Sequence, residues 1–139
     1  MKSRPTQISL EEIQSRLTPL FKDETLQLVL LFGSAAAGKL HSKSDIDLAF
    51  LSDGPVDILT ITNQVIRFLH TDHIDIVDLR RANPLLKFSI MKNCKVIYEK
   101  KEGIFSNFYS LAFRIYIDSQ KLRDIQAIAI KRFLKSKGL

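Results

Sequence analysis

The chain has 139 residues, about the size of one ordinary domain, and a division into two would leave each half short of core. Hydrophobic residues make up 45% and charged residues 26% of the sequence, a balance that excludes disordered and fibrous proteins. Every apolar run is far shorter than the roughly 20 residues that cross a bilayer, and no signal-peptide core follows the N-terminus. We therefore expect a single cytoplasmic domain over residues 1–139, with no membrane association.

Charge is distributed unevenly along the chain. The net charge is +6, but residues 1–79 hold 7 Lys/Arg and 11 Asp/Glu, whereas residues 80–139 hold 14 and 4. An acidic region in a basic protein suits cation-dependent phosphate chemistry; the other interpretation is that Lys and Arg cover solvated helices near the C-terminus. The single cysteine, Cys94, excludes a disulfide framework and a multi-cysteine zinc site, which leaves a free thiol or a small core residue.

The N-terminal part of the sequence predicts a helix followed by a strand. Ser9 stands three residues before Glu12, a capping-box spacing that, with the apolar periodicity after it, predicts a helix over 9–22. The apolar run 26–32 predicts a buried strand that ends at the Gly33-Ser34 turn, and an Ala-rich turn of helix follows it.

The remaining elements continue this alternation. Apolar residues at three- and four-residue steps predict one long helix, or two in line, over about 104–136, with a core-facing stripe from Ile104 and Phe108 through Leu122 and Ile125. We expect an α/β fold with a small mixed sheet flanked by helices and a catalytic core over about 26–99. The other expected elements are a strand over 46–51, a helix over 56–70, a strand over 74–79, a helix from Asn83-Pro84 to Lys92 and a strand over 95–99.

The stretch from Leu31 to Leu48 carries the chemistry. Gly33-Ser34 follows a strand and opens a helical turn, so backbone N–H groups there, together with the Ser34 hydroxyl, can receive phosphate oxygens. Glycine also lets a ligand approach the backbone closely, because it has no Cβ. We therefore expect a triphosphate to dock at this corner.

Three aspartates are the candidate metal ligands and catalytic groups. Asp45 and Asp47 are two residues apart at the start of an extended segment, so both carboxylates leave one face and can reach the same cation. Mg²⁺ prefers such carboxylates together with substrate phosphates. If the strand that contains Asp75 is the neighbour of this segment, Asp75 completes a three-carboxylate site that can hold a second metal and act as general base. Taken singly, each aspartate has an ordinary structural explanation; their joint spacing with Gly33-Ser34 favours the site. His70 and His73 are expected to be solvated turn residues.

These residues resemble a known superfamily. Gly33-Ser34, ten intervening residues and Asp45-Ile46-Asp47 are similar to the signature of the nucleotidyltransferases that share the catalytic fold of DNA polymerase beta, with Asp75 in the place of the third carboxylate. The single-domain length resembles the minimal members of that superfamily, the MntA-type antitoxins that pair with HEPN-domain ribonuclease toxins of the HepT type. The pattern covers residues 26–79, and the C-terminal helix matches in general character alone.

The resemblance implies a function and a role for each residue. It implies transfer of AMP from ATP to a tyrosine of the toxin, which silences the RNA cleavage by the toxin. Ala37 stands where many relatives have arginine; a lost bidentate anion partner puts activity in question, and nearby lysines can replace it as point charges alone. The implied residues are Gly33, Ser34, Lys39 and Lys43 at the nucleotide, Asp45, Asp47 and Asp75 at Mg²⁺, and Asp75 as the base for the acceptor hydroxyl.

The C-terminal helix bears on the partner. It carries more apolar residues than one core-facing stripe requires, among them Tyr116, Ile130 and Phe133, beside several Lys and Arg. Such a helix suits protein docking and predicts a hetero-oligomer with the toxin; the alternative is that the sheet of the domain itself absorbs this wide face.

Three functions stay open on the sequence. The first is the adenylyltransferase antitoxin. The second is a non-catalytic antitoxin that blocks its partner through the C-terminal helix, and the third is a nucleotidyltransferase with a small-molecule or RNA acceptor. We do not expect direct nucleic-acid binding, because the basic half shows no interleaved aromatic and basic platform.

Overall fold

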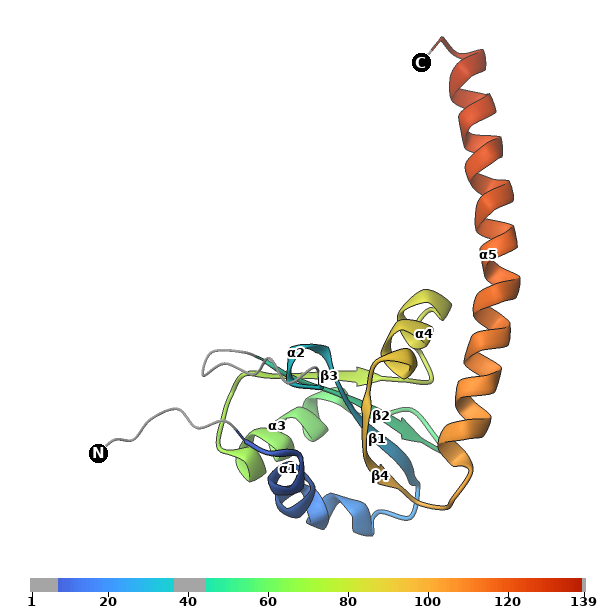
Figure 1. Cartoon of the computed structure of the whole chain (residues 1–139). Coiled ribbons are helices and arrows are strands. Elements are labelled where there is room, and N and C mark those ends of the chain that lie inside the picture. Colours follow the sequence, from blue (N-terminus) through green and yellow to red (C-terminus); the bar gives the residue numbers. More distant parts are fainter. Residues whose placement is uncertain (1–7, 37–44, 139) are drawn as a thin grey trace.

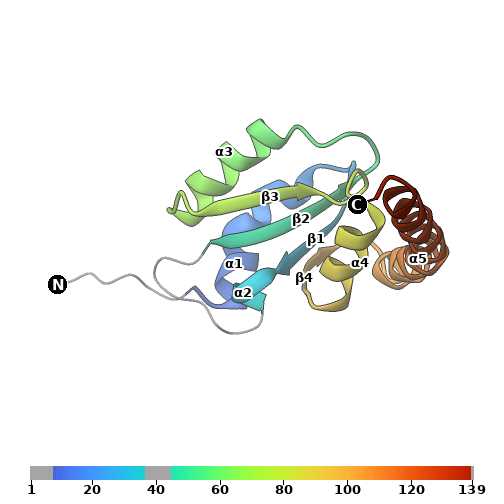
Figure 2. The same cartoon turned by 90° about the horizontal axis from the view of Figure 1, so that it is seen from above.

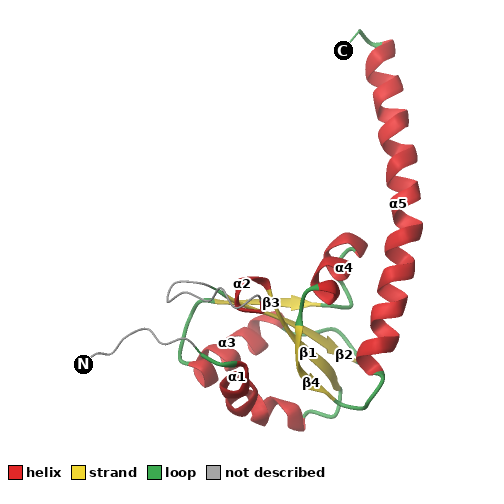
Figure 3. Cartoon of the chain, viewed as in Figure 1, coloured by secondary structure: helices red, strands yellow, loops and turns green. Residues whose placement is uncertain are grey.

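The computed structural model of the chain describes residues 8–36 and 45–138. Helices cover both faces of one four-stranded sheet, and a long C-terminal helix projects from this body (Figures 1 and 3). This is the mixed α/β architecture that the sequence predicted. The elements in chain order are α1 (Leu10–Leu17), the 3₁₀ helix η1 (Thr18–Lys22), β1 (Leu26–Phe32), α2 (Gly33–Ala36), β2 (Ile46–Ser52), α3 (Ile58–Leu69), β3 (Ile74–Asp78), α4 (Pro84–Lys92), β4 (Lys95–Glu99) and α5 (Ile104–Ser136).

The sheet has the strand order β3-β2-β1-β4. β1 is antiparallel to β2 and to β4, whereas β2 is parallel to β3, and α3 supplies the crossover that a parallel pair requires. The register places Phe32 opposite Asp47, and Asp47 opposite Asp75. The end of β1 and the starts of β2 and β3 therefore meet at one end of the sheet, where α2 also lies (Figure 2).

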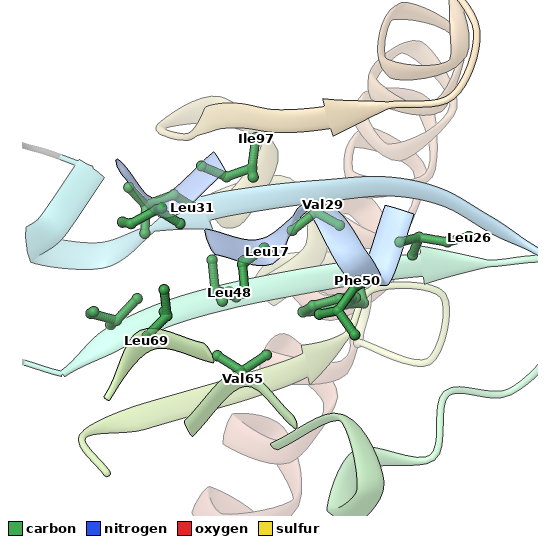
Figure 4. Close-up of a cluster of buried hydrophobic side chains, with 12 residues drawn as sticks. Leu17, Leu26, Val29, Leu31, Leu48, Phe50, Val65, Leu69 and Ile97 are labelled. Carbon is green, nitrogen blue, oxygen red and sulfur yellow. The ribbon is translucent and has the colours of Figure 1, made fainter. Parts of the chain in front are cut away.

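One face of the sheet carries a core that α1, η1 and α3 cover. Val29 of β1 and Leu48 and Phe50 of β2 point to this face, where they pack with Leu17 and Leu69 of the helices (Figure 4). All five side chains are almost fully buried, and burial of each contributes about 1.5–3 kcal/mol to folding.

The other face is covered by α4 and by the start of α5. Here Leu28 and Leu30 of β1 and Ala49 of β2 pack against Ile90 of α4 and Ala112 of α5. Since β1 and β2 are buried on both faces, they read as continuous apolar runs in the sequence.

Helix boundaries follow side-chain caps and proline. Ser9, Asp57 and Asn83 each accept a hydrogen bond from the backbone N–H three residues later, at 2.8–3.2 Å. The α-helix predicted over 9–22 ends at Leu17 instead and continues as η1, in which Pro19 lacks the N–H that an α-helix would use. The helix predicted over 56–70 is α3, which begins after its Asp57 cap.

α5 is one continuous helix of 33 residues. Near its start it packs on the body, and Phe88 of α4 stacks on Tyr116 with ring centroids 4.6 Å apart. The predicted core-facing stripe is wrong already within this region, where Leu111 is 46% and Ile115 is 37% exposed while Ala112 is buried. Farther along, Leu122 is 56% and Ile125 is 64% exposed. α5 extends beyond the sheet and α4, so its distal half projects from the body (Figure 1). Among the described helices, none combines the length and the apolar character that a membrane span needs.

Candidate active site

Gly33 shapes the corner between β1 and α2. Its φ is +75°, in the left-handed region that favours glycine. A Cβ built on Gly33 would lie 3.1 Å from Cγ of Asp47 and closer still to Oδ2 of that residue. Because glycine has no side chain, the Asp47 carboxylate can lie directly against the backbone of the corner. Both the backbone conformation and the close approach of Asp47 therefore favour glycine at position 33.

Asp47 and Asp75 lie side by side on the parallel pair of β2 and β3. They are register partners, so their Cα atoms are about 4.8 Å apart and their side chains leave the same face of the sheet. Burial raises the pKa of Asp47, and the negative charges of Asp75 and Asp45 raise this pKa further. Asp75 itself is exposed despite its apolar sequence neighbours, because β3 is an edge strand. The two neighbouring aspartates thus disfavour the ionised form of Asp47.

Asp45 precedes β2 and has a neighbour that sequence reasoning missed. Nδ1 of His73 lies 3.6 Å from Oδ1 of Asp45, and the Ile46 N–H donates to the His73 carbonyl oxygen at 2.8 Å. The His73 side chain is half exposed, so its solvated setting was expected, but its position beside the acidic group was not. The parallel pairing of β2 with β3 brings His73 beside Asp45, and a single sequence does not reveal this pairing.

The fit of a metal ion depends on what the aspartates can supply. Within residues 8–36 and 45–138, no three or more His, Cys, Asp and Glu side chains are gathered tightly enough to hold a metal ion. Asp47 nevertheless feels the charges of both Asp45 and Asp75. Mg²⁺ commonly takes one or two carboxylates and completes its shell with substrate phosphates and water. The donor set therefore fits Mg²⁺ that is shared with a nucleotide, rather than a closed protein cage.

A cavity of about 540 Å³ opens beside the corner, between β1, α2, α4 and β4. Its size lies in the range of small-molecule sites. Phe32, Leu86 and Ile90 supply apolar walls, and Ser89, Asn93 and Lys95 supply polar groups. The sequence alone did not indicate this cavity, because α4 and β4 come to Gly33 through the tertiary fold.

Cys94 also lines this cavity and is half-buried. Burial raises the pKa of its thiol to about 11, so the thiol is neutral near pH 7. Both interpretations left open by the sequence apply in part, because the thiol is free and the side chain packs partly against the core under α4.

The other predicted nucleotide-binding residues are described in part. Ser34 is the second residue of α2, and the structure describes its backbone. Lys39, Lys43 and Ala37 lie outside the described residues. Their roles at the phosphates stay predictions.

Asp78 is a buried carboxylate with a different setting. It is 9% exposed and accepts hydrogen bonds from the Val56 and Arg80 N–H groups, both at 3.2 Å. These bonds tie the loop before α3 to the turn after β3. Asp78 is therefore a structural residue.

The chain is similar to known proteins in sequence and in fold. A family model described as "Polymerase beta, Nucleotidyltransferase" matches residues 15–103, which include all four strands, Gly33 and the three aspartates. A curated relative from Aphanizomenon flos-aquae, the protein adenylyltransferase MntA, is 29% identical, with 97% of each chain covered. The protein adenylyltransferase MntA of Shewanella oneidensis is 31% identical over 61% of this chain and 64% of the relative.

Two solved structures with a similar fold come from toxin–antitoxin pairs. A crystal structure of a toxin–antitoxin with AMP-PNP has a TM-score of 0.74 and 26% identity, and the match covers 85% of this chain and 98% of that one. An MNT antitoxin in complex with tri-AMPylated Shewanella oneidensis HEPN toxin has a TM-score of 0.70 and 23% identity, with 88% and 99% covered. At that identity the second likeness bears on the fold alone.

Proposed function

Because this chain belongs to the polymerase beta nucleotidyltransferase family, we propose that it is an antitoxin that transfers AMP from ATP to a HEPN-type toxin. The observation that carries the proposal is the Asp47 carboxylate against the Gly33 backbone, with Asp75 in register beside it. The adenylyltransferase relatives and the toxin–antitoxin structure with AMP-PNP support ATP as the substrate.

The proposed reaction is an in-line displacement at the α-phosphorus of ATP. The Gly33-Ser34 corner holds the phosphates with backbone N–H groups, since no Cβ at Gly33 blocks their approach. The acceptor hydroxyl oxygen bonds to the α-phosphorus, the bond to the bridging oxygen breaks, and pyrophosphate leaves. Asp75 takes the proton of the acceptor hydroxyl, because it is exposed at the sheet edge where an acceptor can reach it.

Asp45, Asp47 and Asp75 are the residues that would hold Mg²⁺ together with the phosphates. When bound, Mg²⁺ supplies positive charge that neutralises the phosphates as negative charge develops on the leaving pyrophosphate. Burial, and after it the charges of Asp75 and Asp45, raise the pKa of Asp47, and a bound cation would favour the ionised carboxylate against both effects. Lys39 and Lys43 are retained in the proposal as point charges near the phosphates.

The cavity beside Gly33 is the proposed place for the nucleoside. Phe32, Leu86 and Ile90 offer the apolar surface that a purine needs, and Ser89 and Asn93 offer hydrogen-bonding groups. A nucleoside held there leaves the β3 edge, with Asp75, open to the acceptor. A tyrosine hydroxyl of the toxin is the proposed acceptor, and the cytoplasm is the proposed location because ATP is the substrate.

The experiment combines the purified chain with its cognate HEPN toxin, α-labelled ATP and Mg²⁺. We expect label in the toxin, and we expect the double variant Asp45→Asn and Asp47→Asn to lower the transfer rate by about 10³-fold or more. The matched control is Asp53→Asn, an exposed aspartate in the loop after β2, far along the strand from Gly33. Undiminished transfer by the double variant would defeat the mechanism.

Neutralisation by occlusion is the second candidate function. The exposed apolar residues of α5, among them Ile125 at 64% and Phe133 at 61% exposure, favour it, because they can cover a partner without chemistry. The discriminating experiment is growth rescue from the toxin by the Asp45→Asn and Asp47→Asn variant. Occlusion predicts full rescue, whereas catalysis predicts none.

A further inference from the structure

The distal half of α5 carries apolar side chains in solvent. Every residue from Asp124 to Ser136 is exposed. Leu122, Ile130, Phe133 and Leu134 share one side of the helix and are 56%, 59%, 61% and 39% exposed. We call these four residues the distal face. Large apolar side chains that gather in solvent on one side of a helix mark an interaction site.

The distal face continues the side of α5 that α4 already covers. Phe88 of α4 stacks on Tyr116 of α5, and the first residues of α4 meet the helix near Ser119 and Arg123. Leu85 of α4 and Leu122 of α5 help to line a groove of about 320 Å³ at this junction. The N-terminal end of α4 therefore lies where the distal face begins. At this groove another helix could pack on α5, beyond the part that α4 covers.

We propose that the distal face is the docking surface for a helix of the partner protein whose apolar stripe is flanked by Asp and Glu. Charge selects this occupant. From Ser119 to the C-terminus the chain has six Lys/Arg and one Asp. A second copy of the chain would place these positive groups against each other, whereas an acidic helix would be attracted. The fully exposed length, residues 124–136, is about 20 Å of helix, which matches a partner helix of ordinary length.

The placement of the distal face fits the proposed reaction. Asp47 leaves the same face of the sheet as Ala49, and that face is the one that α4 and the start of α5 cover. In Figure 1, α5 rises on the side of the sheet that carries α4 and α2. A partner on the distal face is thus held on the side of the sheet from which Asp47 and Asp75 point. That the partner is the toxin rests on the proposed function.

The experiment measures binding of the chain to its cognate HEPN toxin by calorimetry, without nucleotide. We expect the double variant Ile130→Glu and Phe133→Glu to weaken binding by about 100-fold, because two apolar contacts are lost and the new charges face acidic groups. The matched control is Ile128→Glu, which is 52% exposed in the native chain and lies on the opposite side of the same helix. We expect this control to bind within about threefold of the native chain. Higher salt should weaken native binding.

Other outcomes would overturn the inference. Native-like binding by the double variant, or loss with Ile128→Glu alone, would show that the toxin docks elsewhere. A dimer of the native chain that the double variant abolishes would identify a second copy as the occupant. Binding to vesicles of phosphatidylglycerol that the double variant abolishes would identify a membrane surface.

The inference and the proposed function fail in different ways. The Asp45→Asn and Asp47→Asn variant tests transfer and should keep native binding to the toxin. Label transfer by the native chain with native-like binding by the double α5 variant would remove the docking surface and leave the enzyme. Binding through the distal face with no transfer would leave the docking surface and remove the enzyme.

Discussion

The Gly33 end of the sheet and the distal half of α5 depart from ordinary burial in opposite ways. At the first, a partly buried carboxylate, Asp47, lies beside two others, so like charges are gathered where the protein could have placed neutral groups. At the second, large apolar side chains such as Phe133 stand in solvent. Folding alone favours neither arrangement, and each would be completed by a component from outside the chain: a cation with phosphates in one case and a partner helix in the other.

The comparison also separates how the two regions resist change. At the Gly33 end, the pairing of β1 with β2 and of β2 with β3 fixes the positions of the side chains. Small substitutions there should therefore alter both geometry and activity. In the distal half of α5 every residue from Asp124 to Ser136 is exposed, so substitutions there should alter binding and leave folding intact.

The largest effect is expected from Asp75→Asn. If Asp75 takes the acceptor proton, this change should lower the rate of AMP transfer by about 10³-fold. Binding of ATP without Mg²⁺ should change little, since Asp47 and the Gly33 corner are untouched. Rapid-quench kinetics and nucleotide titration measure the two quantities. Asp72→Asn, an exposed aspartate in the turn before β3, is the control, and equal losses for both variants would refute the role of Asp75.

Gly33→Ala should damage both stability and nucleotide binding. The left-handed backbone costs an alanine about 1–2 kcal/mol, and its Cβ would press on the Asp47 carboxylate. We expect ATP affinity to fall at least about tenfold. Gly103→Ala separates the two causes, because Gly103 also has a positive φ of 99° but has open space around it. Both variants should have a lower Tm than the native chain. A lower ATP affinity of Gly103→Ala would show that contact between the new Cβ and Asp47 is not the cause of the loss in Gly33→Ala.

Alkylation of Cys94 tests the nucleoside cavity. Because the pKa of this thiol is raised to about 11, labelling by iodoacetamide should be slow at pH 7 and faster at pH 9. Saturating Mg²⁺-ATP should slow the pH 9 reaction by about tenfold, since the nucleoside would cover the sulfur that lines the cavity. Mass spectrometry of the labelled chain gives the rate. An unchanged rate would place the nucleoside elsewhere.

Asp47→Asn should stabilise the chain slightly in the absence of Mg²⁺. The folded state raises the pKa of Asp47, so stability is lost as pH rises through that pKa and the ionised group disfavours folding at pH 7. Solvent screening keeps the gain small, about 1–2 °C in Tm. The gain should vanish below about pH 3, where the carboxyl is protonated in both states. A lower Tm of the variant at pH 7 would show that contacts of the Asp47 carboxylate stabilise the fold by more than its charge destabilises it.

The smallest effect is expected at the distal face. Phe133→Ser should leave the Tm of the isolated chain within about 1 °C, because this side chain is 61% exposed and contacts no core residue. The contrasting variant is Leu48→Ala in the core under α1 and α3, which should cost about 3 kcal/mol. Thermal unfolding of both variants makes the comparison. A large loss for Phe133→Ser would mean that α5 folds back on the body in solution.

Local sequence rules predicted most of the elements and failed where tertiary contacts decide. Helix caps such as Ser9 and Asn83, and the apolar runs of β1 and β2, depend on residues that are close in sequence. The sequence therefore predicted these element boundaries. The core-facing side of α5 was not predicted, because α4, through Phe88, selects a different stripe and the body then ends. The same limit applies to the site. The two-residue spacing of Asp45 and Asp47 is visible in sequence, whereas His73 and the cavity at Leu86 and Lys95 arise from strand pairing and from the packing of α4.

The most direct test of the account is the intact mass of the cognate HEPN toxin after incubation with this chain, ATP and Mg²⁺. The account predicts a mass increase by one or more AMP residues, which requires both ATP and Mg²⁺ and is absent with the Asp45→Asn and Asp47→Asn variant. A toxin of unchanged mass that is nevertheless silenced by the native chain and by the variant alike would contradict it.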